Sequence, residues 1–109
     1  MAVVTVKLLP EHLTREFFMT RFNTAFNLVN YANTHKNEYE AVATWATGDS
    51  PEEAAEEAFD LTNNPSRQAL RDQLYGRHRS VSVGDIVEVV THDGTKEFIC
   101  DSFGWKELV

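Results

Sequence analysis

The sequence predicts an α+β protein in which a small antiparallel, strongly bent sheet, possibly SH3-like, packs with two to three helices. Residues 3–9, 38–47 and 83–101 alternate their side chains with the period of two that strands with one buried face show. Residues 15–31 and 51–60 instead space their apolar side chains by three and four, which is the period of an amphipathic helix.

Size, composition and charge indicate one acidic domain. The chain has 109 residues, of which 42% are hydrophobic and 25% charged, as is usual for a globular protein. We expect a single domain over residues 1–109, with a strand-helix-strand-helix portion followed by a β-rich module from about residue 79. The formal net charge of −7 disfavours broad nucleic-acid binding and suits a basic partner, although solubility alone also explains it.

The sequence shows no sign of a membrane span, a secretory signal or a metal site. No apolar run is long enough to cross a bilayer, and the first residues lack a signal-peptide pattern, so we expect a cytoplasmic protein without membrane association. Cys100 is the only cysteine, which excludes an intrachain disulfide and a thiolate-rich zinc site. We expect no metal, no cofactor, and a monomer or small homo-oligomer.

The N-terminal segment is predicted to form a strand and then a long helix. The strand covers residues 3–9 and ends at Pro10, which lacks a ladder donor. Thr14 can cap the following helix, which is predicted over residues 15–31. Five of its side chains share one core-facing stripe: Phe18, Phe22, Ala25, Phe26 and Val29.

Asparagines mark the region after this stripe. Asn23, Asn27 and Asn30 share another helical face, either as a solvated row or as an amide-rich binding surface. Because asparagine favours turns, residues 30–37 are expected to form a loop. The β-branched and aromatic side chains of residues 38–47 then predict a second strand.

The clearest local signal is Ser50-Pro51-Glu52-Glu53. A serine N-cap, a proline at the first helical position and a glutamate that can reach back make a capping box, so a helix is predicted to start at Pro51. Its apolar face comprises Ala54, Ala55, Ala58 and Phe59. Its outward face carries Glu52, Glu53, Glu56, Glu57 and Asp60. These acids are either a solvated face that also suits the helix dipole or an acidic docking face.

A short helix capped by Ser66 is expected next, ending at Gly76. Basic residues concentrate around it: Arg67, Arg71, Arg77 and Arg79. They can pair with the acids of the preceding helix, or they can bind a phosphate or an acidic partner.

The C-terminal segment is predicted to form a hairpin and one further short strand. Strand residues from Ile86 lead into the turn residues His92-Asp93-Gly94, and residues 96–101 return. Phe103-Gly104-Trp105 indicates a sharp bend that lays two rings over the hairpin.

Two segments of this region carry a resemblance to a known family. Arg79-Ser80-Val81-Ser82-Val83-Gly84-Asp85-Ile86-Val87, followed by Cys100-Asp101-Ser102-Phe103-Gly104-Trp105-Lys106, resembles the YodL-type module of phages and other mobile elements. Its members share an Arg-Ser-x-Ser-Val-x-Asp signature and a closing Asp-Ser-x-Gly-Phe/Trp segment. Residues 59–65 are also similar to a helix end in small proteins of actinobacterial phages. The resemblance covers about half the chain and implies a mobile-element origin without implying a reaction.

The signature has an architectural and a functional interpretation. In the first, the two serines bond neighbouring backbone, Gly84 permits a positive φ and Asp85 caps a turn. In the second, six residues form a recognition patch: Arg79, Ser80, Ser82, Asp85, Phe103 and Trp105.

No catalytic motif stands out. The chain has no glycine-rich phosphate loop and no nucleophile elbow, and Cys100 beside His78 or His92 is the one nucleophile–base combination considered. We therefore expect a non-enzymatic accessory protein that binds a host protein in host takeover or anti-defence. The alternative is a nucleic-acid-binding module that uses the Arg67–Arg79 cluster and the C-terminal aromatic residues.

Overall fold

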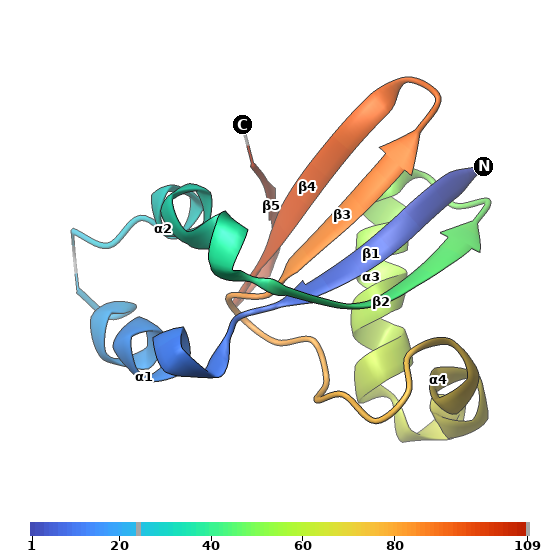
Figure 1. Cartoon of the computed structure of the whole chain (residues 1–109), viewed down its shortest axis with the longest axis horizontal. Helices are drawn as coiled ribbons and strands as arrows, with labels where there is room; N and C mark the ends of the chain where they lie inside the picture. The colour runs from blue at the N-terminus through green and yellow to red at the C-terminus, as the bar shows by residue number, and fades with distance from the viewer. Residues whose placement is uncertain (24, 109) are drawn as a thin grey trace.

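A computed structural model describes residues 1–23 and 25–108 and confirms the α+β class. All strand pairs are antiparallel, and the sheet order is β2-β1-β3-β4-β5 (Figure 1). The strands are β1 (Ala2–Leu8), β2 (Glu40–Thr47), β3 (Ile86–Thr91), β4 (Gly94–Asp101) and β5 (Gly104–Glu107). In the described part of the chain this sheet is open, so an SH3-like barrel does not form.

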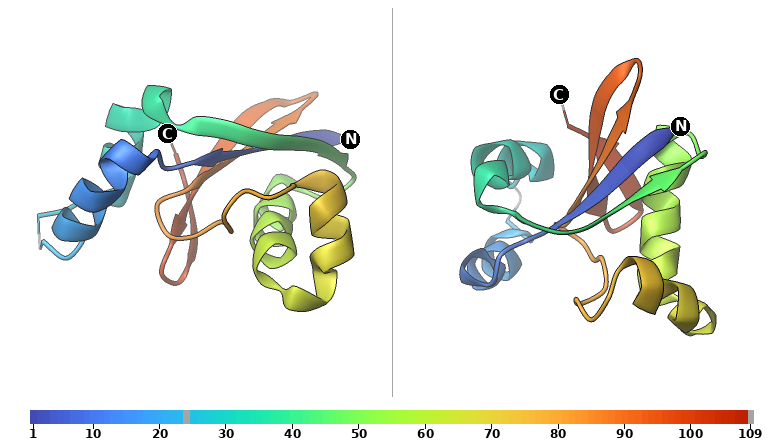
Figure 2. Two further views of the ribbon diagram at one scale, coloured as in Figure 1. Left: turned by 60° about the horizontal axis from the view of Figure 1, so that its bottom comes forward. Right: turned by 45° about the vertical axis from the view of Figure 1, so that its right-hand side comes forward.

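The helices cover the two faces of the sheet at different ends, as Figure 2 shows. They are α1 (Glu11–Thr20), α2 (Leu28–His35), α3 (Pro51–Asn63) and α4 (Gln68–Leu74), with 3-10 turns at Lys36–Glu38 and Pro65–Arg67. None of the helices in the described ranges is long and apolar enough to cross a membrane.

Two buried clusters hold these layers together. Alternate residues of β1 and β3, such as Val4 and Val89, pack against the alanines of α3. On the other face, Phe17 of α1 packs with Ile86 and Ile99. Successive side chains of a strand point to opposite faces of the sheet, so each cluster receives one of the two sets. Because β3 and β4 contribute to both clusters, these strands carry apolar side chains on both faces.

The long helix expected over residues 15–31 is wrong, because two shorter helices occupy this region. Helix α1 starts four residues earlier than expected and has Pro10 as its N-cap residue, without a side-chain cap bond. Thr14 lies inside the helix and donates to the Pro10 carbonyl at 3.0 Å. The buried positions are accordingly Leu13 and Phe17, whereas Phe22 is 79% exposed.

The loop expected over residues 30–37 is also wrong. Asn27 caps α2 by accepting the Asn30 amide at 2.9 Å, and the helix runs to His35. Asn23 instead accepts the amide of Ala25, also at 2.9 Å. The asparagines therefore end one helix and begin the next, and they do not form a single row.

The capping box of α3 is confirmed, since the Ser50 and Glu53 side chains bond each other's backbone amides. At the next helical turn Asn64, and not the expected Ser66, provides the cap by accepting the Ser66 amide at 3.1 Å. Phe59 was expected on the buried face of α3 but is 41% exposed. The helix buries Leu61 and Thr62 in addition to its alanines.

The C-terminal hairpin and its extra short strand are confirmed. Thr91 pairs with Gly94 across the first turn, and Asp101 pairs with Gly104 across the second. Phe103 lies in the second turn and is fully exposed, so its ring does not fold back over the hairpin as expected. Trp105 is partly buried and packs against the cluster on the α3 face.

Candidate functional site

Helix α3 is placed close to the sheet because its inward side chains are small. Ala54, Ala55 and Ala58 are almost completely buried and lie in the same cluster as the strand valines. Small side chains let the helix axis approach the sheet, and α3 contacts β1, β3 and β5. The side of α3 that carries Glu56 and Phe59 thereby lies beside β5, the last strand of the chain.

Four of the five acids on this face already have structural partners. Glu53 completes the capping box, and hydrogen bonding to Ser50 lowers the pKa of this carboxyl. Glu52 lies 3.5 Å from Lys96. Glu57 and Asp60 both pair with Arg67. The pairing of arginines with the preceding helix is thus confirmed for one of the four arginines.

Glu56 differs from the other four acids. Within residues 1–23 and 25–108, its carboxylate makes no ion pair and no hydrogen bond. It lines an open groove of about 350 Å³ between α3 and the β4–β5 hairpin. The other lining residues are Phe59, Cys100, Asp101, Ser102, Gly104 and Trp105. We call this feature the α3–β5 groove.

The groove combines aromatic and acidic side chains. Phe59 and Trp105 each pack partly against the protein and keep part of their surface accessible. Asp101 forms an ion pair with Lys106 at 3.4 Å, which leaves Glu56 as the lining carboxylate without a cation among the described residues. Phe103 does not line the groove, but it is fully exposed in the turn between two lining residues, Ser102 and Gly104. Half-accessible aromatics beside an unpaired charge are typical of a protein-binding anchor site.

The chemistry of Cys100 does not suit a nucleophile. Its side chain is 3% exposed, and burial raises the pKa of the thiol to about 12, with the nearby carboxylates of Asp85 and Asp101 adding to the shift. A thiol with this pKa stays protonated at neutral pH. Among the described residues, no hydrogen bond joins it to a histidine; its thiol lies 3.8 Å from the Asp101 carbonyl.

The Arg79–Asp85 signature forms a hydrogen-bond network, which agrees with its architectural interpretation. Asp85 is completely buried. Arg79 donates to both its carboxylate oxygens, at 2.6 and 2.7 Å. The amides of Leu9 and Ser82 add bonds of 2.7 and 2.8 Å. This carboxylate therefore ties the end of β1 to the segment that enters β3.

Gly84 extends this network through its backbone carbonyl. Its φ is +97°, and a Cβ there would lie 2.9 Å from Cζ of Phe17. The hydroxyl of Tyr39 donates to the Gly84 carbonyl at 2.6 Å, and burial raises the pKa of this phenol. Positive φ and the close approach of a ring both require glycine at this position.

Side chains of α3 and α4 hold the first half of the signature. The Thr62 carbonyl accepts hydrogen bonds from Arg71 and from Ser80. The Thr62 hydroxyl accepts the amide of Val81, and Asn63 donates to the Val81 carbonyl. Ser80 is therefore engaged in holding the chain. The groove that Trp105 lines contains none of Arg79, Ser80, Ser82 and Asp85, so the structure does not unite the six residues of the expected recognition patch.

The arginine cluster is mostly occupied by internal contacts. Arg67 pairs with two acids, Arg71 donates to the carbonyls of Thr62 and His78, and Arg79 binds Asp85. Of the four, only Arg77 makes no ion pair or side-chain hydrogen bond with the described residues. This cluster therefore does not offer the patch of unpaired arginines that the nucleic-acid alternative needs.

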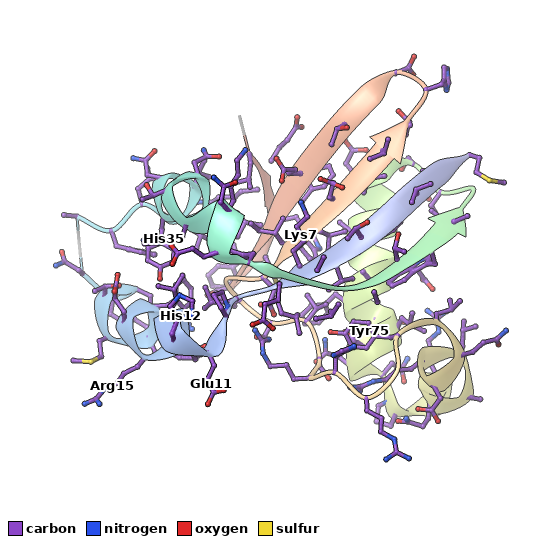
Figure 3. The ribbon with its side chains drawn as sticks, viewed as in Figure 1. Lys7, Glu11, His12, Arg15, His35 and Tyr75 are labelled. Atoms are coloured by element: carbon purple, nitrogen blue, oxygen red, sulfur yellow. The ribbon has the colours of Figure 1, made fainter. Side chains whose placement is uncertain are left out.

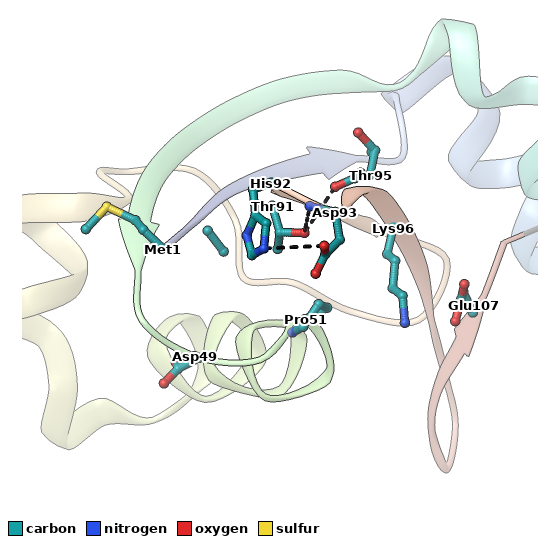
Figure 4. Close-up of a pocket in the computed structure, with 11 residues that line it drawn as sticks. Met1, Asp49, Pro51, Thr91, His92, Asp93, Thr95, Lys96 and Glu107 are labelled. Atoms are coloured by element: carbon teal, nitrogen blue, oxygen red, sulfur yellow. Dashed lines mark hydrogen bonds and ion pairs between the residues drawn. The ribbon is translucent and has the colours of Figure 1, made fainter.

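Two other polar features carry no comparable combination of groups. A hollow of about 440 Å³ lies at the other end of the sheet, where His92 pairs with the neighbouring Asp93 in the β3–β4 turn (Figure 4). Near α1, Glu38 accepts from His12 at 3.0 Å and from His35 at 2.8 Å; Figure 3 shows both histidines on the side of the sheet that carries α1 and α2. Within the described ranges, no group of histidine, cysteine and acidic residues could hold a metal ion.

Comparison with known proteins finds no matching family model, no matching curated protein and no matching solved structure.

The α3–β5 groove is the candidate site that the sequence alone does not predict. The sequence offers the acidic helix and the aromatic end as separate candidates, and the structure brings Glu56 and Trp105 to one surface. The sequence did not predict Phe59 as a site residue, because its helical spacing fits the core-facing stripe. The packing of β5 beside α3 places its partly exposed side chain in the groove.

Proposed function

We propose that this protein is a non-enzymatic accessory protein of a phage or mobile element that binds a host protein through the α3–β5 groove. The observation that carries the proposal is the junction of Glu56 and Phe59 of α3 with Trp105 of β5 in one accessible groove. The resemblance of residues 79–106 to the YodL-type module supports the mobile-element origin, and the protein then acts in the host cytoplasm in host takeover or anti-defence.

The groove favours a partner segment that presents a basic side chain beside an apolar one. Its volume of about 350 Å³ is at the small end of the range for ligand sites, and it is open, which suits one anchoring side chain. The aliphatic stem of a lysine or arginine can lie along the Trp105 ring while its cation meets Glu56. The net charge of −7 also favours encounter with a basic surface.

Two observations support binding in preference to catalysis. The thiol of Cys100 has a pKa raised by burial to about 12, which removes the one nucleophile considered from the sequence. Glu57 and Asp60 on the same helix do not line the groove and are both held by Arg67, so Glu56 has no second free carboxylate on α3 with which to form an acid–base pair.

The test is affinity capture from a lysate of the bacterium that carries the element. We expect the wild type to retain a specific protein that Trp105→Ala and Glu56→Lys lose, because the first removes the anchor and the second reverses the charge. Phe18→Ala is the matched control, since it truncates an aromatic side chain that is 49% exposed on α1 and does not line the groove. The complex should weaken as salt increases. Absence of a specific partner at every salt concentration would contradict the proposal.

A further inference from the structure

The two edges of the sheet differ in how they are protected. Strand β5 is four residues long and carries Lys106 and Glu107. Strand β2 is eight residues long, contains no proline or lysine, and carries one charge, on Glu40 at its start. Natural proteins protect free edges with short strands, charges, prolines or bulges, because an open row of amides and carbonyls pairs readily with another strand.

Helix α4 contacts β2, but within the strand itself the charge and the irregular pairing that protect an edge are confined to the first half. The register between β2 and β1 shifts at Val42, which has no partner residue on β1. Regular pairing covers the five residues from Ala43 to Thr47. None of these five residues is charged. In Figure 1 this part of β2 forms the outer border of the sheet, with β1 on its inner side.

We propose that the free edge of β2 pairs antiparallel with β2 of a second copy of this chain. A twofold axis at Trp45 sets Thr44 opposite Ala46 and Ala43 opposite Thr47 of the partner. Ala43 and Trp45 face the α3 cluster, while Thr44 and Ala46 are exposed on the other face. This register therefore keeps both faces of the sheet continuous across the axis, as antiparallel pairing requires.

The choice of a second copy follows from the composition of this edge. Two chains of net charge −7 repel each other over most of their surfaces, but the five paired residues bring no charge to the axis. The same segment on both sides satisfies its own open backbone groups, and a twofold arrangement closes without leaving a further β2 edge. Because a single strand pair buries little area, we expect a weak, micromolar dimer.

The first measurement is sedimentation or light scattering over a concentration series from about 1 µM to about 500 µM. The mass should rise from 12.4 kDa towards twice that value. In hydrogen exchange, the outward amides of residues 43–47 should become protected as the concentration rises.

The variant pair uses residues that lie directly opposite each other in the sheet. Thr44→Lys with Ala46→Lys places like charges across the proposed axis and should raise the dissociation constant tenfold or more. The control is Thr5→Lys with Val3→Lys, since these residues pair with Thr44 and Ala46 on the same face but in the interior strand β1. It should leave the dimer intact. Circular dichroism identifies a variant that fails to fold. In that case the concentration dependence of hydrogen exchange in the wild type decides whether β2 pairs with a second copy.

Three outcomes would overturn the pairing. One is a wild type that stays monomeric with freely exchanging outward amides. Another is a dimer that both lysine variants affect equally. The third is protection of β2 that depends on a bound host protein and not on concentration, which would assign this edge to that partner.

Discussion

Replacing Asp85 with asparagine should destabilise the protein strongly, because the carboxylate joins three segments. It accepts two bonds from Arg79, one from the Leu9 amide, and bonds from the amide and hydroxyl of Ser82. An asparagine has one acceptor oxygen, and its NH₂ group would face donors. At least one buried amide then loses its partner.

The magnitude follows from burial. Asp85 is completely buried, whereas the Arg79 side chain is 45% exposed and can recover water when the pair is broken. Breaking a buried pair by removing one partner costs about 3–5 kcal/mol. Each buried amide left without an acceptor costs about 1–3 kcal/mol. Because Arg79 is partly solvated, we expect about 3–4 kcal/mol for Asp85→Asn, a large fraction of a typical stability of about 5–15 kcal/mol.

Urea unfolding followed by tryptophan fluorescence measures this loss. The double-mutant cycle of Asp85→Asn and Arg79→Ala isolates the pair, and we expect a coupling energy of about 1–3 kcal/mol. Ser82→Ala is the control: it removes two long hydroxyl contacts of 3.3 Å, one to Asp85 and one from Arg79, and keeps the amide bond, so it should cost below about 1 kcal/mol. A loss below about 1 kcal/mol for Asp85→Asn would refute the structural role of the signature.

Three further predictions concern other parts of the structure. Gly84→Ala should cost about 2–4 kcal/mol by urea unfolding and Gly76→Ala about 1 kcal/mol, because both have positive φ but only Gly84 meets Phe17; equal losses would contradict the close approach. Cys100, with its thiol pKa raised to about 12, should react with a thiol reagent at pH 8 on the order of a thousandfold more slowly in the native than in the unfolded protein; equal rates would disprove its burial. Hydrogen bonds from two histidines lower the pKa of Glu38, so its stabilisation is present above the carboxyl's unfolded pKa and is lost as pH falls through the folded value; Glu38→Gln should flatten the stability profile in acid, and an unchanged profile would argue against these bonds.

Local signals in the sequence predicted the elements whose determinants lie within a few residues. The capping box at Ser50 sets the start of α3, and the turn residues before Gly94 set the β3–β4 hairpin. The architectural interpretation of the signature agrees with the structure for the same reason, since Ser82 and Asp85 are three residues apart and bond each other directly.

The phase of the first helix could not be predicted from spacing alone. Phe18 and Phe22 are four residues apart, but so are Leu13 and Phe17, and both pairs fit a helical stripe. The space above Gly84, which Phe17 fills, decides between them, and it belongs to a distant segment of the chain. The aromatic run is therefore ambiguous until the tertiary contact is known.

The candidate site was predicted in pieces. Glu56 and Trp105 were both proposed as partner-binding residues, but no local pattern relates α3 to β5. Their proximity depends on the strand order, which puts β5 at the edge beside α3, and on the small alanines that let the helix approach. Phe59 joins the site only through this arrangement.

The most direct test of the proposed binding surface uses Trp105 as its own reporter. In a Trp45→Phe background it is the only tryptophan, since the chain has two. Titration with the captured host protein, or with a tryptophan-free basic segment of it, should shift the Trp105 emission to shorter wavelength and give an affinity that Glu56→Lys lowers and salt weakens. An emission spectrum that does not change at saturating partner, with an affinity equal to that of Glu56→Lys, would contradict binding in the α3–β5 groove.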